Sequence, residues 1–135
     1  MPKKKSTSNE NVEKKKRSSS YSRNKGHTYE RKIVNELNKL GFNVGTSRNN
    51  SKKLDDNKVD IFDYDGTLPC YIQTKSTQSI PQYFKIRSES TVDPNRFVII
   101  WSKQEQREKN IISVGEAVIL DKKFFYELIK HYGKV

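Results

Sequence analysis

Two short apolar runs flank a turn signal in residues 59–75, which read VDIFDYDGTLPCYIQTK. The Asp-Gly pair between these strand-like runs is a strong short-range signal for a β-hairpin. If the loop has two residues, Asp60 lies opposite Tyr71. Because side chains alternate along a strand, Gln73 and Lys75 then share the face of Asp60. The pattern therefore predicts a hairpin that presents a carboxylate, an amide oxygen and an ammonium on one surface of a sheet.

The opposite face of this expected hairpin is apolar and suits a core. It carries Val59, Ile61, Cys70 and Ile72. Cys70 is the only cysteine, so an intrachain disulfide and a cysteine zinc site are excluded, and we interpret it as a small core residue. A loop of three or five residues would turn one strand over and separate the polar residues. The arrangement thus depends on the turn type.

The composition divides the chain into a basic tail and a folded part. The 135 residues carry a formal net charge of +11, and the hydrophobic fraction of 32% is low for a globular protein. Residues 1–25 contain nine Lys or Arg, two Glu and one aliphatic residue, Val12, without periodicity. We therefore expect a disordered basic tail over residues 1–24 and a single domain over residues 25–135.

The charge distribution indicates the class of partner. A basic tail on a mildly basic domain favours a polyanion, and nucleic acid is the leading candidate. A tail that serves only solubility, or basic runs that act as nuclear-localisation signals, are alternatives. The tail has no apolar face for a membrane surface, and no apolar stretch approaches the roughly 18–20 residues of a membrane span. We expect no secretory signal and an intracellular, cytoplasmic location, because no apolar segment follows the basic N-terminal residues.

The first half of the domain predicts a helix followed by strands. Apolar residues recur at helical spacing over residues 28–40, with Thr28 as an N-cap and Gly41 as a left-handed C-cap residue. A short strand over residues 42–44 and a long polar loop over residues 45–57 precede the hairpin. Long ordered loops are often functional.

The second half predicts a central strand and a final helix. Residues 76–94 have no clear periodicity and suit a short helix or a lid, whereas residues 96–101 are apolar enough for a central strand. We expect a charged turn or an extension over residues 103–109 and one or two short strands over residues 111–120. Asp121 is a suitable N-cap for the last helix, whose expected buried stripe is Phe124, Phe125, Leu128 and Ile129. This order of elements predicts an α/β or α+β domain with helices packed on a mixed sheet.

Four polar residues in these elements provide the parts of a metal-dependent phosphodiesterase. Such hydrolysis needs a cation that offsets phosphate charge, a placed water and a stabilised leaving oxygen. Asp60 supplies a carboxylate and Gln73 a neutral carbonyl oxygen, and Mg²⁺ prefers oxygen ligands. Lys75 can orient the attacking water or stabilise the charged transition state. Glu30 borders the buried stripe of its helix and completes the site directly or through a water.

Each of these residues also has an ordinary structural explanation. Glu30 suits the first turn of a helix, where an acidic residue complements the helix dipole. Asp60 can cap a neighbouring loop, although carboxylates inside apolar strand runs are uncommon. Gln73 and Lys75 can lie on a solvated sheet face.

The expected phosphate contacts come from the long loop and from a histidine that precedes the helix. They are Ser47, Arg48, Ser51, Lys52, Lys53 and His27. A solvated polar loop is an equal alternative for Lys52 and Lys53.

The order of these segments resembles the PD-(D/E)xK nuclease superfamily, and within it the archaeal-type Holliday-junction resolvases and related phage endonucleases. The quoted segments are GHTYER at 26–31, LGFNV at 40–44, Arg48, VDI at 59–61 and IQTK at 72–75. The resemblance implies a restriction-endonuclease-like core of four mixed strands flanked by helices. It also implies a homodimer that cleaves branched or double-stranded DNA with Mg²⁺ or Mn²⁺ and leaves 5′-phosphate ends, and a phage-encoded origin is compatible with it.

Carried over residue by residue, the resemblance places the helix acid at Glu30, the metal-binding aspartate at Asp60 and the acidic-x-Lys pair at Gln73 and Lys75. The serine that some resolvases use near the phosphate corresponds to Ser47 or Ser51. Gln73 departs from the usual acidic residue, which removes one negative charge and weakens the expected metal affinity. A non-catalytic nucleic-acid-binding or phage structural protein on a degenerate nuclease fold is therefore the alternative.

Overall fold

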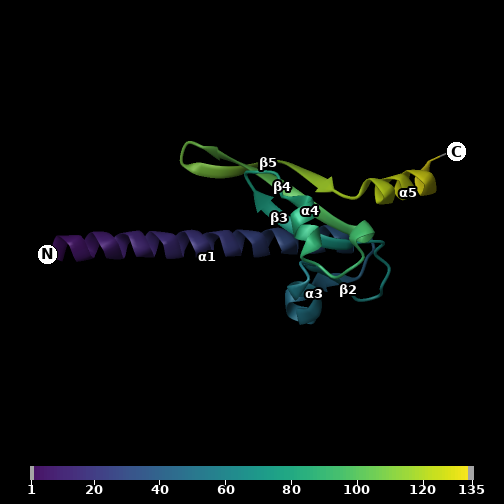
Figure 1. Ribbon diagram of the computed structural model, residues 1–135, viewed down its shortest axis with the longest axis horizontal. Helices are drawn as coiled ribbons and strands as arrows, with labels where there is room; N and C mark the ends of the chain where they lie inside the picture. The colour runs from purple at the N-terminus through teal and green to yellow at the C-terminus, as the bar shows by residue number, and fades with distance from the viewer. Residues whose placement is uncertain (1, 134–135) are drawn as a thin grey trace.

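The N-terminal helix α1 (Pro2–Lys39) dominates the shape of the molecule and extends well beyond the sheets (Figure 1). The structure is a computed structural model that describes the backbone of residues 2–133 and the side chains of residues 21–133. The backbone of residues 2–24 is helical where the sequence favoured disorder. Residues 3–25 contain neither proline nor glycine, so no helix-breaking residue ends the helix there.

The C-terminal part of α1 is the helix that the apolar periodicity predicts. Tyr29 and Ile33 are buried, and Gly41 has a φ of +106° just after the helix end, as a C-cap residue should. The predicted N-cap at Thr28 is wrong, because Thr28 lies inside α1. Its hydroxyl donates a hydrogen bond to the carbonyl of Asn24 at 2.8 Å.

The domain is mixed α+β with two small sheets. Strands β1 (Val44–Thr46) and β2 (Ile61–Asp63) pair antiparallel. In the second sheet β3 (Tyr71–Thr77) pairs parallel with β4 (Phe97–Arg107), which pairs antiparallel with β5 (Asn110–Ile119). The expected single four-stranded sheet is thus replaced by one two-stranded and one three-stranded mixed sheet.

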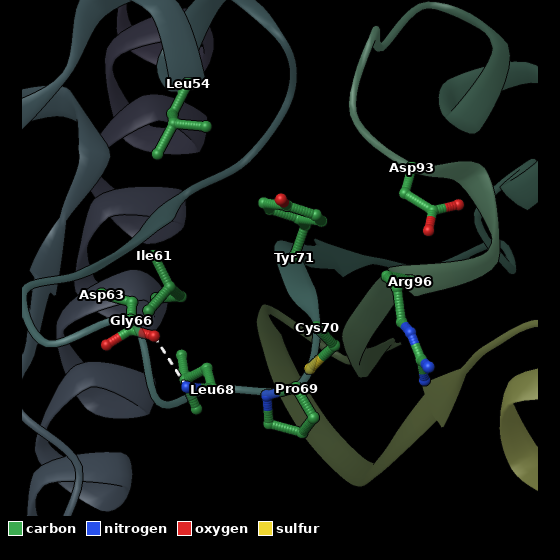
Figure 2. Close-up of a pocket in the computed structure, with 10 residues that line it drawn as sticks. All are labelled: Leu54, Ile61, Asp63, Gly66, Leu68, Pro69, Cys70, Tyr71, Asp93 and Arg96. Atoms are coloured by element: carbon green, nitrogen blue, oxygen red, sulfur yellow. Dashed lines mark hydrogen bonds between the residues drawn. The ribbon is translucent and has the colours of Figure 1, made fainter. Parts of the chain in front are cut away.

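The predicted two-residue hairpin across Asp-Gly is wrong. Strand β2 pairs with β1, and the connection from β2 to β3 is a wider loop that passes Gly66 at a φ of +67°. The carboxylate of Asp63 holds this loop by accepting a hydrogen bond from the Leu68 amide at 2.7 Å (Figure 2). Both apolar runs contain a strand, but the Asp-Gly turn between them does not pair these two strands with each other.

Asp60 nevertheless connects the two sheets. Its amide donates to the carbonyl of Ile72 in β3 at 2.8 Å, and its carbonyl accepts from the amide of Ser47 at 2.8 Å. A residue one position before β2 therefore lies between the end of β1 and the middle of β3. This position explains how the polar residues of the quoted stretch approach each other without a hairpin.

The expected loop over residues 45–57 contains two short helices, α2 (Ser47–Asn50) and α3 (Lys52–Asp56). Ser51 separates them and caps α3, since its hydroxyl accepts from the Leu54 amide at 3.3 Å. Further along, residues 76–94 include α4 (Tyr83–Ser88) and lead into a 3₁₀ turn, η1 (Pro94–Arg96).

Of the two alternatives for the charged segment over residues 103–109, a turn or an extension, the structure shows an extension of the strand as far as Arg107. Strand β4 runs to Arg107, and the turn to β5 passes Glu108 at a φ of 54°. The resulting β4–β5 hairpin projects from the sheet in the same direction as the N-terminal part of α1 (Figure 1). Polar side chains are compatible with this long ribbon because much of it is exposed.

Two apolar clusters lie on opposite sides of the β3–β4 pair. The first joins α1, the strands and α5 (Lys122–Tyr132), and its buried members are Tyr29, Ile33, Val44, Ile61, Ile72, Val98 and Phe124. The second comprises Val59, Tyr83, Phe97 and Ile99. Cys70 packs beside the first cluster as expected, and burial raises the pKa of its thiol to about 11.

The final helix is confirmed in position but only partly in its buried stripe. Asp121 caps it by accepting from the Lys123 amide at 2.8 Å. Phe124 is buried, whereas Phe125 and Ile129 are 47% and 46% exposed. None of the helices that the structure describes is both long and apolar enough to traverse a bilayer.

Candidate functional site

Asp60 is the best-positioned residue of the candidate site. Thr74 in β3 donates its backbone N–H and its hydroxyl to Oδ2 of Asp60, at 2.7 and 3.1 Å. Burial raises the pKa of this carboxyl, and the Thr74 hydrogen bonds and the charge of Lys75 oppose the increase. Asp60 is therefore a rigidly oriented carboxylate in a partly desolvated position.

Glu30 on α1 is the second carboxylate, and it is only 7% exposed. Its Oε1 is buried without a hydrogen-bond partner. Burial and then the charge of Asp60 raise the pKa of Glu30 to about 7. The two acids predicted from distant segments thus lie near enough to interact electrostatically, and their mutual repulsion is incompletely compensated.

Arg48 partly compensates this negative charge. Its Nε lies 3.8 Å from Oε1 of Glu30, and its charge opposes the rise in the Glu30 pKa. His27 lies one helical turn before Glu30, and the pKa of its imidazole is lowered by burial and by nearby arginines that include Arg48. Arg48 and His27, which the sequence predicts as phosphate contacts, therefore lie near the carboxylates.

Lys75 and Gln73 approach the site along β3. Lys75 acts on the carboxyl of Asp60 through its charge and is half-buried. Gln73 is 6% exposed, and its Oε1 is buried without a hydrogen-bond partner. Its Nε2 donates weakly to the Thr74 carbonyl at 3.4 Å. The alternative of a solvated sheet face is therefore wrong at Gln73, where an acceptor oxygen is buried.

The serines and lysines expected to contact phosphate have different positions. Ser47 is fully buried at 0% exposure, which does not suit direct contact with a phosphate in this conformation. Ser51 is occupied as the cap of α3. Lys52 and Lys53 are exposed on α3 and remain accessible to a polyanion.

The donor set fits a hard cation. Among the described residues, no group of three or more His, Cys, Asp or Glu side chains forms a metal-binding cluster. The candidate set instead contains two carboxylates, Glu30 and Asp60, and the amide oxygen of Gln73. Buried oxygens of Glu30 and Gln73 lack partners, and such orphaned acceptors require a compensating group. Oxygen ligands of this kind suit Mg²⁺.

Two contributing residues were missed in the sequence. Thr74 orients Asp60, and Asp55 on α3 adds negative charge that raises the pKa values of both Glu30 and Asp60. The only feature of the sequence that points to Thr74 is its position between Gln73 and Lys75. Asp55 gave no signal, because its proximity depends on the folding of α3 beside α1.

The cavity drawn in Figure 2 is a separate feature of the molecule. It has a volume of about 360 Å³ and lies between the β2–β3 connection and η1, where Asp63, Tyr71 and Arg96 are among the lining residues. None of the four proposed catalytic residues lines it. The candidate residues lie instead on α1, on α2, on β3 and just before β2, and Glu30 and Gln73 among them are buried.

Comparisons of the chain with family models, with curated proteins and with solved structures gave no match.

Glu30 should make the stability of the metal-free protein depend on pH. Its pKa rises from the ordinary 4.5 to about 7 on folding, so the unfolded state binds fewer protons between these values and stability falls as pH rises. We expect Glu30→Gln to remove this loss, which amounts to up to about 3 kcal/mol above pH 7. Urea unfolding with EDTA at pH 5, 6, 7 and 8 measures it. Equal pH slopes for both proteins would contradict the desolvated position of Glu30.

Proposed function

We propose that this protein is a metal-dependent endonuclease that hydrolyses phosphodiester bonds in DNA. The observation that carries the proposal is the pair of desolvated carboxylates, Glu30 and Asp60, beside the basic residues Arg48 and Lys75. Such a pair is costly without a cation, and perturbed acids cluster at functional sites. The adjacent positive charges suit a polyanionic substrate.

Each side chain has a role that follows from its position. Glu30, Asp60 and Gln73 would hold the cation through oxygen atoms, and Thr74 keeps the Asp60 carboxylate oriented. Lys75 would orient the attacking water or stabilise charge on the phosphate in the transition state. Arg48 would contact a phosphate oxygen of the bound strand. Bound Mg²⁺, or Mn²⁺ in its place, would offset phosphate charge and lower the pKa of a coordinated water.

The order of the elements supports the proposal in part, although β1 to β4 lie in two sheets and not in the single sheet that the resemblance implies. Strands β1 to β4 include antiparallel and parallel pairs, and α1 precedes them while α5 follows. The nuclease resemblance implies four mixed strands between helices, with the acidic helix first. A Holliday junction is one of the branched substrates that this resemblance suggests, and a homodimer would place two such sites on one junction.

A non-catalytic nucleic-acid-binding protein on the same fold is the second candidate. The observation in its favour is Gln73, which leaves two carboxylates where the resemblance implies three acidic residues. With fewer charges the site has a lower affinity for Mg²⁺. The basic residues would then bind DNA without cutting it, with the steep salt dependence that phosphate contacts cause.

A Gln73→Glu variant should bind Mg²⁺ or Mn²⁺ more tightly than the wild type. The substitution adds one negative charge at a buried position next in the chain to Thr74, the residue that binds Asp60, and this charge favours the cation and destabilises the metal-free protein. We expect an affinity gain of about tenfold, measured by isothermal titration. The matched control is Gln106→Glu in the exposed part of β4, which should change neither quantity. Equal metal affinities of Gln73→Glu and wild type would remove Gln73 from the ligand set.

The deciding experiment is cleavage of labelled four-way junction, flap and linear duplex DNA with Mg²⁺ or Mn²⁺ or with EDTA. Metal-dependent cutting supports the nuclease, and the preferred substrate identifies its class. Tight, salt-sensitive binding without cutting of any substrate supports the second candidate.

A further inference from the structure

A groove lies between α1 and the sheet, close to the end of β3. It has a volume of about 480 Å³. The residues that line it are Tyr21, Ser22, Lys25, Ser76, Thr77, Gln78, Ser79, Gln104 and Ile111. Ser76 and Thr77 at the end of β3 line the groove, whereas Lys75 does not. Its lining residues come from α1, from the end of β3 and the segment after it, and from β4 and β5, and Figure 1 shows that α1 and the β4–β5 hairpin project in the same direction.

Side chains from β4 donate hydrogen bonds to the segment that forms one wall of the groove. The indole N–H of Trp101 donates to the hydroxyl of Thr77 at 2.9 Å, and the ammonium of Lys103 donates to the carbonyl of Gln78. The hydroxyl of Thr77 in turn donates to the carbonyl of Ser79 at 2.7 Å. These bonds order the segment after β3, so its hydroxyl and amide groups form a preformed polar surface.

The other wall presents an aromatic ring and a positive charge. Tyr21 is 56% exposed, and the ammonium of Lys25 lies 5.8 Å from the centre of its ring. Ile111 of β5 adds an apolar contact on the facing side. None of the described residues that line the groove is acidic, and Lys25 and the nearby Lys103 make its surroundings basic.

These features favour single-stranded over double-stranded nucleic acid as the ligand of the groove. Single-stranded nucleic acid is recognised by basic grooves with exposed aromatic rings, on which unpaired bases stack. The faces of bases inside a duplex are covered by their neighbours and cannot stack on a protein ring. Hydroxyl and amide groups add hydrogen bonds to phosphates and base edges without demanding one sequence.

We propose that this groove binds an unpaired segment of DNA, with a base stacked on Tyr21. This inference rests on the proposed nuclease function and adds its substrate class, which is branched DNA with a single-stranded arm. The arm enters between α1 and the β4–β5 hairpin, and Lys25 contacts its phosphates.

Binding of a labelled oligothymidylate of about 12 nucleotides, a length within the usual site size, tests the groove without cleavage. Fluorescence anisotropy of the full chain in EDTA compares the wild type with Tyr21→Ala. Loss of one base–aromatic stack should weaken binding about 5- to 100-fold. Binding of a duplex of equal length should change less than twofold, because phosphate contacts are retained.

Tyr126→Ala is the matched control. Tyr126 is 57% exposed on α5, and the ammonium of Lys122 lies 5.5 Å from its ring centre, which reproduces the local setting of Tyr21. Its removal should leave both affinities unchanged. The groove assignment is overturned if Tyr21→Ala binds the oligonucleotide like the wild type, or if it loses duplex and single-strand binding equally. Absence of cleavage would instead contradict the proposed function and would leave this binding result interpretable.

Discussion

Asp60→Asn should reduce metal-dependent DNA cleavage by about 1000-fold or more, the largest effect that we expect from a single substitution. An asparagine oxygen can still accept the hydrogen bonds from Thr74, so the geometry of β3 is retained. The substitution replaces a charged carboxylate ligand of the proposed metal site with a neutral amide, which binds a cation more weakly. The measurement is single-turnover cleavage of the preferred substrate with saturating enzyme, beside metal titration of the same variant.

The same variant should fold normally and retain most of its affinity for DNA. Burial raises the pKa of Asp60, so removal of its charge does not destabilise the metal-free protein. Asp56→Asn in α3 is the control, because Asp56 is exposed and should be dispensable. Cleavage by Asp60→Asn at the wild-type rate would show that Asp60 does not hold the cation.

Lys75→Ala should reduce cleavage by about 100- to 1000-fold with metal affinity unchanged. Lys75 is expected to act on the water or the phosphate in the transition state, whereas the oxygens of Asp60 and Glu30 are expected to bind the cation. Its effect should therefore appear in the cleavage rate at saturating metal and DNA.

This difference separates the two substitutions. Asp60→Asn should lose metal binding and cleavage together, and Lys75→Ala should lose cleavage alone. Lys130→Ala in the last turn of α5 is the control for removing a lysine, since Lys130 is exposed and lies on the final helix. If Lys75→Ala weakens metal binding as strongly as Asp60→Asn does, or leaves the rate intact, the role of Lys75 is wrong.

Much of the candidate site could be predicted because its residues have unusual local contexts. Asp60 lies in an apolar run, and Glu30 borders the apolar stripe of a helix whose C-terminal part the structure contains. Arg48 and His27 were expected near phosphate, and the structure places both beside Glu30. The buried position of Ser47 could not be predicted, because it depends on the hydrogen bond from its amide to Asp60.

The errors share one physical cause, which is that strand pairing is not a local property. The Asp-Gly turn suggested that β2 would pair with β3, but β2 pairs with β1, and Asp63 stabilises a wider loop. For the same reason the charged residues after Trp101 left a turn and an extension open, and β4 continues because β5 satisfies its backbone groups.

The sequence by itself indicated which polar residues are candidates for a functional site. It also determined the positions of the central strand and the final helix, and the basic character of the N-terminal segment. Helical periodicity, capping residues and charge are local properties that short windows contain. Only the tertiary structure decided that β3 and β4 run parallel, that Asp60 joins the two sheets, and that Glu30 and Asp60 share a desolvated site. These features arise from contacts between segments far apart in the chain, whose free energy depends on burial and hydrogen bonding that no local pattern specifies.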